Sequence, residues 1–101
     1  MTKKILLACA GGFSTSMLVE KMKESALDKG IEVVIDACGE GDLENYLPAD
    51  IIMLGPQMGH AEDSVREKVG ENIPVTVINM MDYGMMDGEK VLNTALHLIT
   101  K

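Results

Sequence analysis

Short apolar runs alternate along this chain with longer stretches in which apolar residues recur every three or four positions. The runs cover residues 5–8, 31–37, 51–54 and 75–78 and are rich in Ile, Val and Leu, which is typical of β-strands. The first and third runs contain no charged residue, so they predict central strands buried on both faces. Glu32 and Asp36 interrupt the second run and indicate a strand at the edge of the sheet.

The stretches between and after these runs predict helices. They cover residues 17–29, 42–47 and 59–69, with a last helix after Asp87. In the first of them, Leu18, Met22 and Ala26 stand four positions apart and share one face. Asp87 is placed to cap the last helix. Residues 79–88 follow neither period, and we expect an irregular, Met-rich loop there.

Strands that alternate with helices predict an α/β fold with an open parallel sheet. With right-handed crossovers, we expect four strands in the order 2-1-3-4 and helices on both faces, as in flavodoxin-like folds. In that order the topological switch point lies between strands one and three, at their carboxyl ends. We expect residues 1–101 to form a single domain, because a chain of this length fits one core.

Composition excludes several classes of partner. The formal charge of −7 and the isoelectric point near 4.6 argue against binding nucleic acid or anionic lipid. No apolar run approaches the roughly 20 residues of a membrane span, so we expect no direct membrane insertion. Two cysteines far apart, Cys9 and Cys38, do not form a disulfide framework and suit a reduced, cytoplasmic setting.

The most informative stretch is Cys9-Ala10-Gly11-Gly12-Phe13-Ser14-Thr15-Ser16, between the first predicted strand and the first predicted helix. Backbone N–H groups of such a loop can converge on a phosphate, and the helix dipole adds partial positive charge. A thiol at the rim of an anion site has its thiolate form favoured, and the thiolate is the nucleophile. The stretch therefore suggests phosphoryl transfer through cysteine. The alternatives are an inert buried thiol and hydroxyl residues that only cap the helix.

The same stretch resembles the cytoplasmic IIB component of the bacterial sugar phosphotransferase system, in the lactose/cellobiose/chitobiose family. The family's Cys-x-x-Gly-x-Ser-Thr-Ser pattern matches Cys9, Gly12, Ser14, Thr15 and Ser16. The resemblance continues through Leu54-Gly55-Pro56-Gln57 and through Asp82-Tyr83-Gly84 to Asp87-Gly88, and so covers nearly the whole chain. It departs at Phe13, where the family usually has Met, and at Met58-Gly59-His60.

The resemblance implies a phosphocarrier in the bacterial cytoplasm. Cys9 would accept a phosphoryl group from the phosphohistidine of an EIIA protein and pass it to a sugar, a β-linked disaccharide, bound by the membrane permease EIIC. Residues from Ala10 to Ser16 would hold the phosphate. No metal or organic cofactor is needed, and we expect a monomer.

Two other classes of protein remain as alternatives when only the residues are considered. Low-molecular-weight phosphatases and arsenate reductases have a similar loop, but phosphatases carry an Arg where this chain has Thr15, and they use an Asp-Pro acid that this chain lacks. A missing cation removes the stabilisation that a hydrolase transition state needs. A flavodoxin-like FMN carrier would not need Cys9, and only Phe13, Tyr46 and Tyr83 are available to stack a flavin.

The remaining candidates have plain structural interpretations beside the functional ones. Gln57 and Tyr83 are expected either to line the site or to finish strand ends. His60 and His97 have no spacing that indicates a metal pair, and we expect both on the surface. Cys38 has no phosphate loop after it, and we expect it to be a small residue of the core or of a turn. Four methionines crowd one loop, where we expect them to fill gaps in the core, the alternative being an apolar rim for partner proteins: Met80, Met81, Met85 and Met86.

Overall fold

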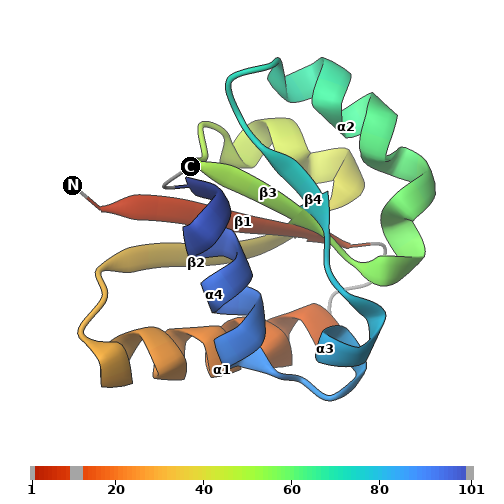
Figure 1. Ribbon diagram of the computed structural model, residues 1–101. Helices are drawn as coiled ribbons and strands as arrows, with labels where there is room; N and C mark the ends of the chain where they lie inside the picture. Colours follow the sequence, from red (N-terminus) through yellow and green to blue (C-terminus); the bar gives the residue numbers. More distant parts are fainter. Residues whose placement is uncertain (1, 10–12, 100–101) are drawn as a thin grey trace.

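The computed structural model describes residues 2–9 and 13–99, and it gives the backbone alone for Cys9, Phe13, Ser14, Thr15 and Glu40. Its four strands are β1 (Lys3–Cys9), β2 (Val33–Gly39), β3 (Ile51–Leu54) and β4 (Val75–Val77). They pair in parallel in the order β2-β1-β3-β4, so the predicted sheet and the predicted order are confirmed. All four run from left to right in Figure 1.

The two central strands are apolar because the sheet is covered on both sides. Residues 5–8 of β1 and all of β3 are buried. β2 is the edge strand that its polar residues predicted, with Val34 exposed and Asp36 half-buried. Alternation along β1 separates two cores: Ile5 and Leu7 face one, and Leu6 and Ala8 face the other.

Two α-helices cover the face of Ile5 and Leu7: α1 (Phe13–Lys29) and α4 (Gly88–Ile99). Their inward side chains include Leu18, Met22 and Leu92, all of them fully buried. The N-terminus of α4 is capped by Asp87, whose Oδ1 accepts a bond of 3.2 Å from the backbone N–H of Lys90, as the sequence predicts. Figure 1 shows α1 below the sheet and α4 in front of it, with the lower part of α4 next to α1.

The opposite face has shorter elements. Two 3₁₀ segments, η1 (Glu40–Tyr46) and η2 (Pro56–Ala61), and one α-helix, α2 (Glu62–Val69), cover it. Leu43, Met58 and Val65 bring their side chains into the second core. The predicted helix over 42–47 is a 3₁₀ segment, and of the predicted helix over 59–69 only residues 62–69 are α-helical.

Residues 79–88 differ from the prediction of an irregular loop. They contain a short helix, α3 (Met80–Gly84), which begins because Asn79 caps it. The side-chain oxygen of Asn79 accepts bonds of 2.8 Å from the N–H of Met81 and 3.2 Å from that of Asp82. This arrangement satisfies two backbone donors that a helix start otherwise leaves without partners.

Candidate functional site

The candidate site lies at the carboxyl edge of the sheet, where β1 and β3 end side by side. Ala8 pairs with Leu54 in the parallel register, and the backbone N–H of Gly55 donates a bond of 3.1 Å to the carbonyl of Ala8. β1 and β3 both end at this edge, and β2 lies on the other side of β1. This is the topological switch point of the sheet, where open α/β folds place their ligands.

The connection from β1 to α1 is short. β1 ends at Cys9 and α1 begins at Phe13, so Ala10, Gly11 and Gly12 are the only residues between them, and these three lie outside the described residues. The helix begins four residues before its predicted start at Met17. Ser14, Thr15 and Ser16 therefore belong to the first turns of α1 and do not precede the helix as caps.

The start of α1 offers backbone donors at the same edge as Cys9. The first N–H groups of an α-helix have no partner within the helix, and they carry the positive end of its dipole. An anion at such a helix end is stabilised by both. The backbone thus places Cys9 four residues before a helix start that suits a phosphate, while Ser16 is exposed.

Packing fixes the direction of α1. Leu18, Val19 and Met22 are buried in the core that also contains Ile5 and Leu7 of β1. Gly88 of α4 lies against the backbone of the same stretch: a Cβ at Gly88 would stand 2.5 Å from the carbonyl carbon of Lys21. The middle of α1 is therefore packed against both the core over β1 and the start of α4.

Gln57 lies at the carboxyl edge, in the turn that follows β3. Met58 and Ala61 of η2 are buried, and the N–H of Met58 donates a bond of 2.8 Å to the carbonyl of Gly55. Gln57 lies between Gly55 and Met58, the two residues that this bond joins, and its side chain is exposed. His60 is exposed as well. The structure therefore places Gln57 on the same edge as Cys9 and leaves it accessible.

Tyr83 lies on α3, beyond the carboxyl end of β4. Its side chain is half-buried and packs against the core beneath α1 and α4. Its backbone N–H donates a bond of 2.9 Å to the carbonyl of Asn79, within α3. Tyr83 thus has a packing role, while its helix stands at the edge of the sheet where the candidate site lies (Figure 1).

Three neighbours of Tyr83 are far more exposed than the sequence suggested. Met80, Met81 and Met85 are 74%, 72% and 72% exposed, so the prediction that they fill the core is wrong. Of the four methionines in this segment, only Met86 packs against the core. Their hydrophobicity favoured burial, and the one signal that a helix starts here was Asn79, a residue type that caps helix N-termini.

Arg66, the sole arginine in the sequence, is far from the carboxyl edge in the topology. It lies on α2, and its guanidinium donates a bond of 2.8 Å to the carbonyl of Val75, the first residue of β4. It also pairs with Glu62 one turn earlier in α2. The bond holds the guanidinium of Arg66 at the amino end of β4, a strand that β3 separates from β1 and Cys9.

Among the described residues, the other cysteine and the histidines do not form a second candidate site. Cys38 is half-buried on β2 and packs against the second core, and His97 is exposed on α4. Among the side chains that the structure describes, no three His, Cys, Asp or Glu residues are grouped to hold a metal ion. Within residues 2–9 and 13–99, no helix combines the length and the hydrophobicity needed to cross a membrane.

An open parallel sheet with its candidate site at the switch point defines the structural class, and comparison with known proteins defines the family. The model of the family described as "PTS system, Lactose/Cellobiose specific IIB subunit" matches residues 4–94. The chain belongs to this family of phosphotransferase system components. Members of the family serve sugar transport and are phosphotransferase-type proteins.

Curated relatives match over nearly their full lengths. The oligo-beta-mannoside-specific EIIB component of Bacillus subtilis (strain 168) is 46% identical over 99 residues, which cover 96% of each chain. The cellobiose-specific EIIB component of Lactococcus lactis subsp. lactis (strain IL1403) is 42% identical over 104 aligned residues, again 96% of each chain. The galactose-specific EIIB component of Lactococcus lactis subsp. cremoris (strain MG1363) is 41% identical with the same coverage.

Two solved structures share the fold. The cellobiose-specific IIB component from Borrelia burgdorferi is 36% identical and superposes with a TM-score of 0.82, covering 99% of this chain and 94% of that one. The lactose-specific IIB component domain from Streptococcus pneumoniae also has a TM-score of 0.82, at 21% identity, covering 96% of this chain and 97% of that one.

Proposed function

We propose that this protein is a cytoplasmic phosphocarrier in which Cys9 carries the phosphoryl group. The observation that supports it most directly is the position of Cys9 at the carboxyl end of β1, four residues before the start of α1, in a chain of the IIB family. The donor is the phosphohistidine of an EIIA protein. The acceptor is a hydroxyl group of a sugar held by the membrane permease EIIC.

The transfer consists of two displacements at phosphorus. In the first, the Cys9 thiolate attacks the phosphorus, an S–P bond forms, and the P–N bond to the donor histidine breaks. In the second, the sugar oxygen attacks, an O–P bond forms, the S–P bond breaks, and the hydroxyl proton goes to a base or to water. Such reactions depend mainly on alignment and on stabilising charge at the three equatorial oxygens.

The chain's own residues would supply that stabilisation. In the proposal, backbone N–H groups from Ala10 to Ser16 hold the phosphoryl oxygens, and the positive end of the α1 dipole adds to them. The hydroxyl groups of Ser14, Thr15 and Ser16 are further donors. Gln57, exposed on the same edge, and Tyr83 are candidates for the rim of the site.

Phosphatase activity is the alternative that the geometry disfavours. A hydrolase needs a cation near the developing charge, and Arg66 binds the carbonyl of Val75 at the amino end of β4, which β3 separates from β1. Thr15 occupies the loop position that an arginine has in such phosphatases. Without that cation, phosphocysteine should be stable toward water yet still transferable to an aligned acceptor.

In this proposal the permease, and not this protein, determines which sugar is phosphorylated. Relatives named for an oligo-beta-mannoside, cellobiose and galactose are 46%, 42% and 41% identical to this chain. Three different sugars at nearly equal identity mean that the overall likeness does not select one. We propose a β-linked disaccharide as the substrate class, which the names of two of these relatives favour over a free hexose.

The lifetime of the phosphoprotein tests the proposal. The protein is labelled with radioactive phosphate from phosphorylated EIIA, isolated, and held in buffer. We expect slow loss in water, and rapid discharge when membranes containing the matching EIIC and its sugar are added. We expect no turnover of p-nitrophenyl phosphate, because the lack of one electrostatic donor already costs about 10²–10³ in rate. Sustained hydrolysis of p-nitrophenyl phosphate that requires Cys9 would favour the phosphatase.

A further inference from the structure

The short helix α3 and the residue that ends it expose three methionines, Met80, Met81 and Met85, which we call the α3 methionine surface. They are 74%, 72% and 72% exposed. Met85, directly after the helix, stands one turn after Met81, and its backbone N–H donates to the carbonyl of Met81 over 3.0 Å. Scattered apolar residues are normal on a surface, but three exposed thioethers within six residues form a local chemical feature.

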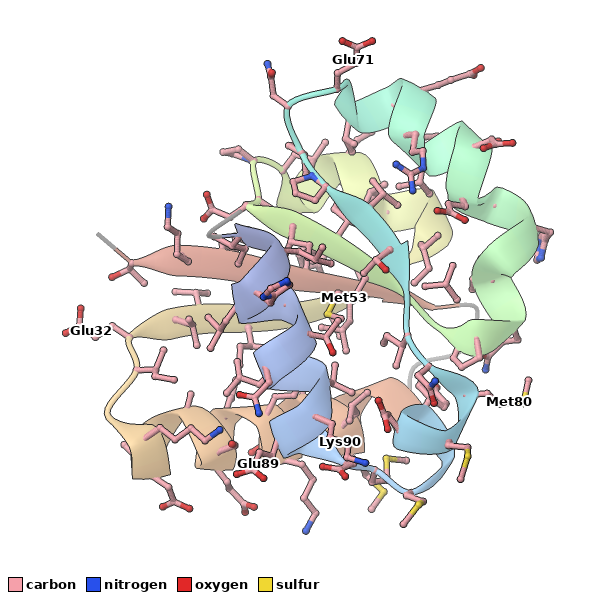
Figure 2. All side chains as sticks on the ribbon, viewed as in Figure 1. Glu32, Met53, Glu71, Met80, Glu89 and Lys90 are labelled. Atoms are coloured by element: carbon pink, nitrogen blue, oxygen red, sulfur yellow. The ribbon has the colours of Figure 1, made fainter. Side chains whose placement is uncertain are left out.

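The chain contains its own contrast to this surface. Met22, Met53 and Met58 are 0%, 1% and 6% exposed, in the two cores on either side of the sheet. Figure 2 shows the difference directly: Met80 projects outward from α3, while Met53 lies within the sheet. The same side chain thus occupies a fully accessible and a fully protected environment in one protein.

Methionine is oxidised at sulfur when a peroxide can reach it. The sulfur lone pair attacks one oxygen of a hydroperoxide, an S–O bond forms, and the O–O bond breaks. The departing oxygen takes a proton and leaves as water or an alcohol, and the sulfur has lost two electrons. The resulting sulfoxide is polar, and a dithiol-dependent sulfoxide reductase restores the thioether with release of water.

We propose that the α3 methionine surface is a reversible oxidation site, at which hydroperoxides convert an apolar surface into a polar one without unfolding the protein. The three side chains are not part of either buried core, so their oxidation leaves the core packing intact. Tyr83 and Met86 attach this segment to the core, and Asn79 caps the helix through the two N–H bonds described above. The site therefore changes polarity while its scaffold stays in place.

This inference goes beyond the phosphocarrier proposal and does not depend on it. The surface nevertheless lies on the same edge of the sheet as Cys9, because α3 follows the carboxyl end of β4. Its polarity thus changes at the edge where the candidate site stands.

The test is site-resolved oxidation of the full chain by hydrogen peroxide. Thiols are first blocked as methyl disulfides, and the native protein is then sampled over time and digested with trypsin. Fragment spectra of the peptide covering residues 69–90 separate Met80, Met81, Met85 and Met86, and the peptide covering residues 30–66 contains Met53 and Met58. We expect the three surface methionines to oxidise at least about tenfold faster than Met53 and Met58, because oxidation follows exposure. Equal rates in the native protein would overturn the proposal.

Two further measurements test the change of polarity and the intact fold. A variant with Met80→Leu, Met81→Leu and Met85→Leu keeps an apolar surface that peroxide does not modify. We expect oxidation to shorten the retention of the wild type on a hydrophobic column more than that of the variant, which also retains Met17. The thermal transition should stay cooperative, and sulfoxide reductases for both epimers should restore retention. An equal shift in both proteins, or loss of the cooperative transition at the stage when only the surface is oxidised, would overturn the proposal.

Discussion

The two faces of the sheet are stabilised in different ways. On one face, α1 and α4, of 17 and 12 residues, pack against each other and against β1 through a continuous core. On the other face, η1, η2 and the eight-residue α2 make fewer turns and each contributes only a few buried side chains. The first face depends on close helix packing, and the second depends more on individual contacts.

Polar bonds to backbone carbonyls hold the second face. Lys4 at the start of β1 donates from its Nζ to the carbonyl of Tyr46 in η1 over 2.6 Å, and from its N–H to a carboxylate oxygen of Asp50 over 2.7 Å. Arg66 makes the equivalent bond from α2 to the carbonyl of Val75. The comparison teaches that short, irregular elements need such bonds because they bury too few side chains to be positioned by packing alone.

Truncating one leucine on each face should give the largest effect. Leu92 of α4 and Leu43 of η1 are both fully buried. We expect Leu92→Ala to lower the free energy of unfolding by about 4 kcal/mol and Leu43→Ala by about 2–3 kcal/mol, because a short 3₁₀ segment can shift to fill part of the cavity. Urea unfolding of both variants measures the difference. A larger loss for Leu43→Ala would reverse the comparison.

A methyl group at the crossing of α1 and α4 should have the next largest effect. A Cβ at Gly88 would stand 2.6 Å from the backbone nitrogen of Met22, so Gly88→Ala must separate the two helices at a cost of about 2–3 kcal/mol. Gly59 in η2 is the matched control, because a Cβ there meets nothing within 4 Å. We expect Gly59→Ala to stay within about 0.5 kcal/mol of the wild type in thermal unfolding. Equal stabilities for the two variants would show that the helices are not in close contact.

Removing the polar bond of Arg66 should have the smallest effect of the three. Arg66→Met keeps an extended apolar side chain but loses both the donor to the Val75 carbonyl and the exposed ion pair with Glu62, which we expect to cost about 1 kcal/mol in all, mostly from the bond to the carbonyl. Glu62→Gln removes the charge of the ion pair but keeps the bond to Val75, so it serves as the control and should be close to neutral. Chemical denaturation of both variants tests whether this bond, and not the helix charge as such, holds α2 to β4.

The regular half of the molecule could be predicted from the sequence, and the irregular half only in part. Residues 5–8 and 51–54 are apolar throughout because both of their faces are covered, and that pattern is visible without a structure. Periodic spacing likewise identified α1 and α4. The choice between a 3₁₀ segment and an α-helix in η1 and η2 depends on how far each segment must reach to bury one or two side chains. The spacing of apolar residues along the sequence contains no information about that distance.

The candidate site, too, could be predicted only in part from the sequence. The sequence placed Cys9 at the end of a strand and before a helix, and the structure agrees. The start of α1 was predicted too late, because Ser14, Thr15 and Ser16 have modest helix propensity, whereas the burial of Leu18 and Val19 holds this end of the helix in place. The exposure of the α3 methionines was not predicted, since Met is equally compatible with a core and with a surface.

The central claim is that Cys9, and not Cys38, accepts the phosphoryl group. The most direct test is to incubate the wild type, Cys9→Ser and Cys38→Ser with phosphorylated EIIA and to map the adduct by mass spectrometry at neutral pH. We predict phosphate on Cys9 in the wild type and in Cys38→Ser, and none on Cys9→Ser. Phosphate retained in Cys9→Ser and lost in Cys38→Ser would contradict the claim.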